Sequence, residues 1–181
     1  MINAVGVIEM KSIAKGMEAC DSALKSAGVR LISAHPSCPG KYEILLTGNL
    51  SDVQTALERV RSFYGSYIVD AVLMGRIDES VVKALMGAQT AVATGALGIV
   101  ETFSAASAIK AADTAVKTSR VEIYDLRVSR GMGGKGVVLL TGEVSDVTAA
   151  VEAGGEYAKC QGLFASSSVV AAPHEEVWQH L

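Results

Sequence analysis

The sequence predicts an α/β protein of the α+β kind, built from two tandem copies of one domain with the element order β-α-β-β-α-β. Three observations support this prediction. Short β-branched runs alternate with longer segments of helical periodicity, and blocks of the first half recur in the second half. Half of the 181 residues are hydrophobic and few are aromatic, which suits a well-packed aliphatic core.

The first half of the chain predicts each of these elements in turn. A glycine-containing run of β-branched residues at 5–9 predicts a buried strand. Ser12 is placed to cap a helix whose apolar positions, including Ile13 and Met17, continue to about Ala27, where Gly28 ends it. The remaining predicted elements are strands at 29–34, 42–47 and 67–74, a second helix from a cap at Ser51 to Tyr64, and a short third helix from Asp78 through Leu85.

The second half repeats the first in ordered blocks. Gly6 of the first strand recurs as Gly98, an offset of 92, and the Asp-x-Ala-x-Lys block that ends the first helix recurs at the same offset. Lys41 and the Leu-Leu-Thr-Gly and Ser-Asp-Val blocks behind it recur at an offset of 94, beginning at Lys135. The second copy therefore carries two extra residues, most simply in the loop between its second and third strands. This domain-sized period predicts a duplication, with domains at 1–87 and 95–181 and a small, polar linker between them.

The composition narrows the classes of function. A net charge of −3 argues against nucleic-acid binding, which normally needs a basic surface. Three cysteines without regular spacing do not form a disulfide framework, which favours a reducing compartment. The N-terminus lacks the features of a signal peptide, and the apolar run at 89–100 is too short to cross a bilayer. We therefore expect a cytoplasmic protein with no membrane or nucleic-acid partner.

The most unusual stretch is His-Pro-Ser-Cys-Pro-Gly-Lys at 35–41. Pro36 and Pro39 fix their own φ angles and lack a backbone N–H, so a stiff turn outside the sheet ladder is expected. Gly40 permits a tight turn with positive φ, and the turn carries a single soft, redox-active thiol, that of Cys38. The corresponding loop of the second copy, at 129–134, has no thiol and three glycines, which indicate a close backbone approach or a mobile loop.

The other candidate reactive residues favour structural roles. Cys20 and Cys160 are expected to be small buried hydrophobic residues, and His35 the exposed end of a strand. Glu9 and Glu101 follow an apolar strand in equivalent repeats, so polar contacts within the fold are expected in place of paired catalytic carboxylates. The sequence contains no Cys-x-x-Cys-x-x-Cys run and no nucleophile–base set, so it predicts neither a ferredoxin-type site within one chain nor an enzyme.

Several of these motifs resemble those of bacterial microcompartment shell domains. Gly-[Val/Ile]-[Ile/Val]-Glu, Asp-x-Ala-x-Lys and Thr-Gly-x-[Leu/Val]-Ser-Asp-Val occur in both halves, and the Pro-His segment at 173–174 is similar to one in that family. The resemblance covers essentially the whole chain, twice and in non-permuted order. It implies a ferredoxin-like sandwich of sheet and helices in each copy. It also implies a homotrimer that forms a pseudohexagonal tile beside other microcompartment shell proteins.

The stretch at 35–41 carries a more specific resemblance. Ser-Cys-Pro-Gly-Lys is similar to the loop of tandem-domain members from propanediol-utilisation compartments, in which three chains hold one [4Fe-4S] cluster on the three-fold axis. This implies Cys38 as the cluster ligand, with the fourth iron open to another ligand and encapsulated redox enzymes as further partners. The resemblance also implies pore-loop residues (Ser37, Pro39, Gly40, Gly133 and Gly134) and tile-edge residues (Lys25 and Lys117).

These expectations leave three interpretations of function. In the first, the tile carries a cluster for electron transfer across the shell or for delivery of clusters to enzymes inside it. In the second, the same tile has no cluster and its central opening passes metabolites. In the third, the fold serves a small-molecule-binding regulator or enzyme, which the lack of a nucleophile–base set, metal cage or phosphate loop disfavours.

Overall fold

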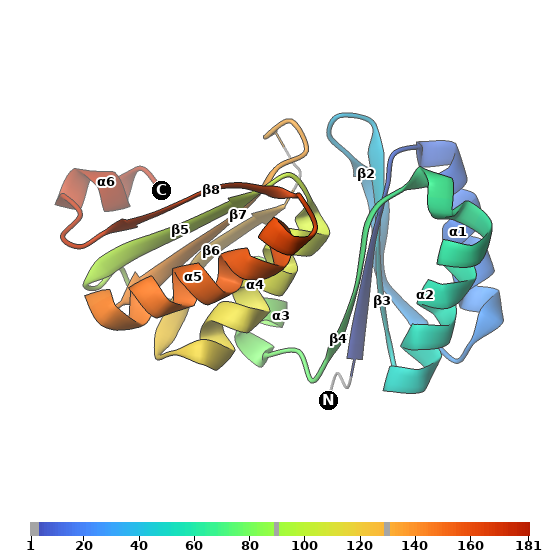
Figure 1. Ribbon diagram of the computed structural model, residues 1–181, viewed down its shortest axis with the longest axis horizontal. Coiled ribbons are helices and arrows are strands. Elements are labelled where there is room, and N and C mark those ends of the chain that lie inside the picture. Colours follow the sequence, from blue (N-terminus) through green and yellow to red (C-terminus); the bar gives the residue numbers. More distant parts are fainter. Residues whose placement is uncertain (1–3, 89–90, 129–130) are drawn as a thin grey trace. The chain divides into compact units, whose positions relative to one another are not determined.

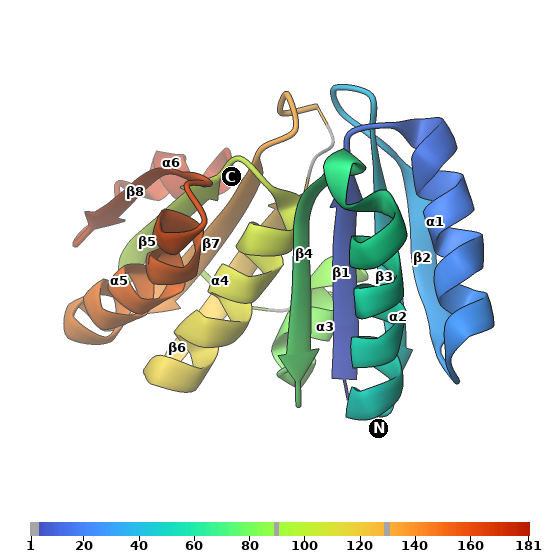
Figure 2. The same cartoon turned by 45° about the vertical axis from the view of Figure 1, so that its right-hand side comes forward.

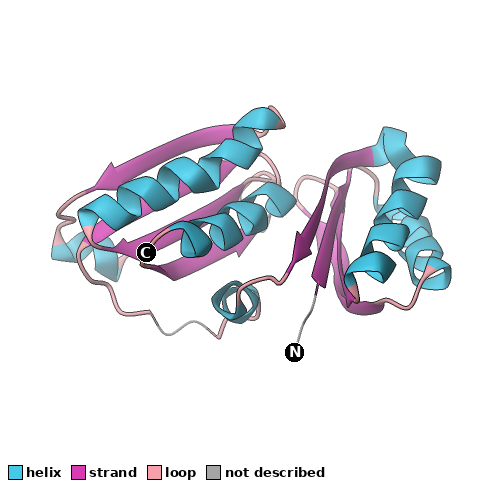
Figure 3. Cartoon of the chain, turned by 60° about the horizontal axis from the view of Figure 1, so that its bottom comes forward, coloured by secondary structure: helices cyan, strands magenta, loops and turns pink. Residues whose placement is uncertain are grey.

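The computed structural model describes residues 4–88, 91–128 and 131–181. The chain divides into two compact units: unit 1 contains residues 1–77 with 104–106 and 129–134, and unit 2 contains 78–103, 107–128 and 135–181. Each unit has a four-stranded antiparallel sheet with helices packed against it (Figures 1 and 3). The predicted fold class and the doubled β-α-β-β-α-β order are therefore confirmed.

Unit 1 is built on a sheet of strand order β2-β3-β1-β4, with β2 at one edge. Ser12 precedes the first helix, and its Oγ accepts a hydrogen bond from the Lys15 backbone N–H at 3.3 Å, which confirms the predicted cap. The elements are β1 (Ala4–Met10), α1 (Ile13–Ser26), β2 (Arg30–Ser37), β3 (Lys41–Gly48), α2 (Leu50–Tyr64), a 3-10 turn (Gly65–Tyr67) and β4 (Ile68–Gly75).

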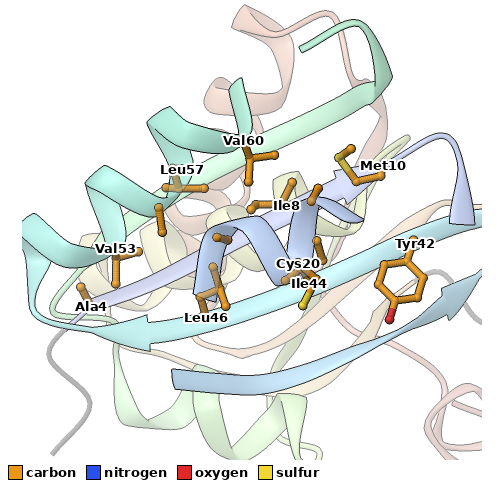
Figure 4. Close-up of a cluster of buried hydrophobic side chains, with 13 residues drawn as sticks. Ala4, Ile8, Met10, Cys20, Tyr42, Ile44, Leu46, Val53, Leu57 and Val60 are labelled. Atoms are coloured by element: carbon orange, nitrogen blue, oxygen red, sulfur yellow. The ribbon is translucent and has the colours of Figure 1, made fainter. Parts of the chain in front are cut away.

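The core of unit 1 lies between the sheet and helices α1 and α2. Alternate residues of β1 and β3, among them Ile8 and Ile44, point into this layer (Figure 4). Gly6 allows α2 to approach the sheet, because a Cβ at this position would lie 2.8 Å from Cγ1 of Val53. The same relation recurs in unit 2, where a Cβ on Gly98 would lie 2.7 Å from Cγ1 of Val147. Close helix–strand packing is therefore the physical reason for this shared glycine.

Unit 2 repeats the sheet with strand order β6-β7-β5-β8. The short helix predicted to start at Asp78 is α3, and Asp78 caps it, since its carboxylate accepts the Ser80 backbone N–H at 2.9 Å. The last helix is anchored to the sheet by the Tyr124 and Trp178 rings, whose centroids are 5.0 Å apart. The elements are α3 (Glu79–Leu85), β5 (Ala96–Thr102), α4 (Ala105–Thr118), β6 (Val121–Val128), β7 (Gly136–Gly142), α5 (Val144–Cys160), β8 (Phe164–Val170) and α6 (Glu175–Gln179).

The strand registers locate the two extra residues of the second copy. Leu31 of β2 pairs with Leu46 of β3, and Ile123 of β6 pairs with Leu140 of β7; both ladders shift register directly after these pairs. From the first repeat to the second, the residue on the earlier strand is offset by 92 positions (Leu31 to Ile123) and its partner on the later strand by 94 (Leu46 to Leu140). The insertion therefore lies between β6 and β7, as predicted.

Several local predictions are wrong. β2 continues through Pro36, which lies opposite Tyr42 in the ladder; because β2 is an edge strand, the missing proline N–H removes no obligatory ladder bond. The second helix begins at Leu50 after Asn49, so Ser51 lies inside the helix and is not its cap. The end of α1, in contrast, agrees with the prediction, because its C-cap is Ala27 and Gly28 follows directly.

Candidate functional site

Cys38 lies at the tip of the β2–β3 hairpin, which projects past the end of the sheet of unit 1 (Figure 2). Its side chain is exposed, and the peptide bond to Pro39 is cis. Gly40 closes the turn with a φ of 89° and donates its N–H to the Ser37 carbonyl at 3.0 Å. The expected tight turn with a positive φ is thus present, although it is the end of a paired hairpin and not a loop outside the ladder.

Gly134, a predicted pore-loop residue of the second repeat, packs against this tip within unit 1. A Cβ on Gly134 would lie 2.7 Å from the Cys38 carbonyl oxygen and 2.9 Å from Pro39 Cδ, so only glycine fits here. The Lys41 Nζ also approaches the Gly134 carbonyl oxygen at 3.4 Å. Gly133, in contrast, has open space around its Cα and a φ of 61°. Residues 129–130 of the same loop lie outside the described residues.

A row of four polar side chains crosses the sheet of unit 1 beneath the hairpin. His35 of β2 is paired with Glu43 of β3, Glu43 with Glu9 of β1, and Glu9 with Asp70 of β4. Because residues alternate between the two faces of a strand, this row lies on the face opposite the α1–α2 core. All three carboxylates are buried. The equivalent row in unit 2 consists of Arg127, Val137, Glu101 and Ser166.

Glu9 has a partner for each of its two carboxylate oxygens. Its Oε1 pairs with Lys41 Nζ at 2.7 Å, and its Oε2 accepts the backbone N–H of Ala105 at 2.8 Å. Neighbouring Asp70 accepts the hydroxyl of Ser104 at 2.8 Å. Burial raises the pKa of the Glu9 carboxyl above its ordinary value, and the Lys41 hydrogen bond and charge oppose this rise without cancelling it. The prediction that Glu9 makes structural polar contacts is confirmed.

Two other members of the row were not identified as site residues from the sequence. Glu43 Oε1 and His35 Nδ1 are buried and have no hydrogen-bond partner among the described residues, as is also true of Ser37 Oγ. The expectation that His35 is an exposed strand end is therefore wrong, because β2 continues to Ser37 and the half-buried His35 side chain has its Nδ1 fully buried. A charged residue such as Glu43 inside an otherwise apolar strand was the available sequence signal.

The remaining cysteines differ from each other. Cys20 is buried as predicted, and burial raises the pKa of its thiol. Cys160 is exposed, which contradicts the expectation of burial, because it lies two residues after Ala158 and therefore off the face of α5 that is buried. Within the described ranges, no group of three or more His, Cys, Asp or Glu side chains could hold a metal ion.

The two predicted tile-edge lysines occupy equivalent positions in different surroundings. Lys25 pairs with Asp21 at 2.7 Å, and its side chain is 74% exposed. Lys117 pairs with Asp113 at the same distance, but Asp113 is buried and also accepts the Asp78 backbone N–H at 2.9 Å. Lys25 is therefore free to reach a neighbour, whereas Lys117 neutralises a buried carboxylate of its own unit.

The duplicated fold and the strand and helix motifs that both halves share define a tandem shell-domain architecture, and comparison with known proteins identifies the family. The family model described as BMC domain matches residues 4–77 and again 96–173. The chain therefore belongs to the BMC-domain family and is a tandem-domain shell protein of bacterial microcompartments, as the sequence motifs indicated. No helix of residues 4–88, 91–128 and 131–181 is long and apolar enough to cross a membrane.

Individual relatives sharpen this assignment. The chain is 41% identical over 181 residues to the bacterial microcompartment shell protein PduT of Citrobacter freundii, an alignment that covers 100% of this chain and 98% of the relative. It is 28% identical to the carboxysome assembly protein CcmO of Synechococcus elongatus, covering 98% of this chain and 68% of CcmO. A crystal structure of a microcompartments protein from Desulfitobacterium hafniense DCB is 37% identical, with a TM-score of 0.83 and 99% coverage of both chains.

These relatives settle the third interpretation. Proteins similar to this chain over most of its length are shell and assembly proteins, so the chain is a structural protein and not an enzyme. The first two interpretations, with and without a cluster, concern what the shell protein carries.

Proposed function

We propose that three copies of this chain form a pseudohexagonal tile of the microcompartment shell, and that Cys38 of each copy binds one shared [4Fe-4S] cluster at the three-fold axis. The observation that carries the proposal is the exposed thiol at the tip of a hairpin whose equivalent in the second repeat has glycines and no thiol. In a closed ring of three two-domain chains, six equivalent hairpins would present three thiols.

The residues present fit such a cluster only when chains combine. Iron–sulfur clusters are held mainly by cysteine thiolates, and one described chain brings no three candidate ligands together. Cys20 is buried in the core, whereas Cys38 is exposed and is not bonded to another cysteine. Three chains would supply three sulfur ligands and leave the fourth iron to a non-protein ligand. When bound, the cluster would supply one-electron redox chemistry or be passed to an acceptor protein.

The chain's own contribution is a firmly held thiol. The ladder pairs Pro36 with Tyr42 and Ser37 with Lys41, which fixes the hairpin up to the residue directly before Cys38. Gly134 packs against the Cys38 carbonyl on one side. A ligand held in fixed geometry loses little conformational entropy when it binds, so this support favours a metal-site role.

The test is anaerobic purification followed by iron and sulfide analysis and electron paramagnetic resonance of the reduced protein. We expect about four iron and four sulfide ions per trimer in the wild type, and their loss in Cys38→Ser. Cys160→Ser is the matched control, because Cys160 is also exposed but lies at the end of α5. Iron content that is unchanged in Cys38→Ser would refute the cluster.

The second candidate is the same trimeric tile without a cluster, whose central opening passes metabolites. The feature that favours it is the glycine-rich loop of the second repeat, where Gly131 and Gly133 carry no side chain and have open space around them. A trimer that stays colourless after anaerobic reconstitution with iron and sulfide would support this candidate over the first.

The proposed tile would also contact other shell proteins along its edges, and encapsulated redox enzymes at the cluster. Lys25 is the stronger edge candidate of the two lysines, because its side chain is exposed. Its ion pair with Asp21 is a surface pair along α1, which is weak enough to be exchanged for a contact with a neighbour. We expect Lys25→Ala to leave the trimer intact and to impair its assembly into sheets, as seen by electron microscopy.

A further inference from the structure

Within unit 1, a buried carboxylate meets the start of a helix. Glu9 accepts the backbone N–H of Ala105, the first residue of α4, while Lys41 holds its other oxygen. Ser104, directly before the helix, donates its hydroxyl to Asp70. The side chain of Glu9 is 0% exposed. The first N–H groups of a helix have no partner inside it and attract negative charge, so this arrangement stabilises the start of α4.

Unit 2 carries the same carboxylate and lysine in the same register. Glu101 stands in the place of Glu9, and it pairs with Lys135 at 3.1 Å as Glu9 pairs with Lys41. Ser166 lies opposite Glu101 on β8, as Asp70 lies opposite Glu9 on β4. The Glu101 side chain is 30% exposed, and no backbone N–H of the described residues donates to it. The carboxylate of unit 2 therefore lacks the helix start that its counterpart has.

The start of α1, in contrast, lacks within the described ranges a carboxylate that could accept its first backbone N–H groups. Ser12 stands in the place of Ser104, and the first turn of α1 contains no acidic residue. The backbone N–H groups of Ile13 and Ala14 find no acceptor among the residues that the structure describes. The Ile13 N–H is the counterpart of the Ala105 N–H that Glu9 accepts, so it is the group that a carboxylate in the position of Glu9 would bind.

The same end of α1 has an exposed apolar face. Ile13 and Met17 were expected to be core positions, yet their side chains are 36% and 52% exposed. The equivalent residues of α4, Ala105 and Ile109, are both completely buried. Exposed apolar side chains beside unpaired N–H groups are typical of an uncovered interface.

We infer that Glu101 of one chain accepts the backbone N–H of Ile13 in a second copy of this chain, with Lys135 beside the contact and Ser12 facing Ser166. The occupant is a second copy because this chain contains both incomplete halves, and Glu9 with Ala105 is the completed version of the same contact. The contact joins two different surfaces, one from each copy. Every Glu101 and every Ile13 of a small assembly therefore finds its partner only when the copies form a closed ring. The inference rests on the proposed trimer and names the residues that join it.

Two variants of the full-length chain test this contact by sedimentation equilibrium and native mass spectrometry. Glu101→Gln keeps the shape of the side chain and removes its charge. Ala14→Asp puts a carboxylate on an exposed position in the first turn of α1, where it favours the isolated helix but repels Glu101 of the neighbour. We expect each change to raise the dissociation constant of self-association at least about tenfold.

Glu79→Gln is the matched control, because Glu79 is an exposed carboxylate that is also paired with a lysine, Lys83. We expect this substitution to leave self-association unchanged. Thermal unfolding of each variant identifies any loss of folding. A wild-type trimer whose stability of association is unaffected by both variants would overturn this inference and leave the proposed tile intact. A wild type that stays monomeric would overturn both.

Discussion

Gly16 offers a sharp test of how tightly α1 packs on its sheet. A Cβ at this position would lie 2.5 Å from Tyr42 Cβ and 2.7 Å from its Cγ and Cδ1. These atoms sit close to the strand backbone, so the tyrosine cannot rotate away and the helix or strand must shift. Overpacking of this kind costs about 3 kcal/mol, whereas alanine in place of glycine within a helix gains about 1 kcal/mol. Gly16→Ala should therefore destabilise the protein by about 2 kcal/mol.

Thermal and urea unfolding followed by circular dichroism at one protein concentration measure this change. A loss of about 2 kcal/mol corresponds to a decrease in Tm of about 4–8 °C for a chain of this length. Gly65→Ala is the matched control, because Gly65 has a φ of −52° and open space around its Cα. We expect this control to be neutral or slightly stabilising. A Gly16→Ala protein as stable as the control would refute the packing argument.

The second repeat suggests a rescue. The positions equivalent to Gly16 and Tyr42 are Ala108 and Gly136, so the larger side chain has moved from the strand to the helix. Gly16→Ala combined with Tyr42→Gly should lose less stability than the sum of the two single changes, by about 1–3 kcal/mol. Strict additivity would show that the two positions do not share this space.

Two further outcomes follow from the charges of the fold. Lys117→Met should reduce the free energy of unfolding by about 1–2 kcal/mol, because it leaves the buried Asp113 carboxylate without its cation. Lys25→Met is the control and should change the free energy of unfolding by less than about 0.5 kcal/mol. Equal effects of the two substitutions in urea titrations would contradict this prediction. Because burial raises the folded-state pKa of Glu9 above its unfolded value, its contribution to stability is complete below the unfolded pKa and is lost as the pH rises through the folded one. The stability of the wild type relative to Glu9→Gln should therefore fall as the pH rises above the ordinary glutamate range, and a rise would contradict it.

The sequence was sufficient for the architecture because the repeat states each element twice. The cap at Ser12 was predictable because a short polar side chain before an apolar helical pattern commonly caps the helix, but the same reasoning failed at Ser51, which lies inside α2. Pro36 misled the prediction because a proline is excluded from central strands only, and the sequence does not say that β2 is the edge of its sheet.

The site was less predictable because it depends on residues distant in sequence. The Cys38 hairpin could be singled out by its composition, but the polar row of His35, Glu43, Glu9 and Asp70 exists only through strand pairing. Cys160 was misplaced because the prediction rested on its residue type, whereas it lies off the buried face of α5, which includes Gly154, Gly155 and Ala158. Local pattern predicts elements well, and it leaves open which side chains the elements bring together.

The two-residue insertion between β6 and β7 has a consequence for how such chains diversify. The strands on either side keep the same pairing and the same bulge as in the first repeat, so register is set by the sheet and the hairpin tip is free to vary in length. One repeat could therefore acquire or lose a thiol, a charge or a wider opening at its tip while its sheet was left undisturbed. New functional groups can therefore be introduced at the hairpin tip by changing a few residues, while the fold stays the same.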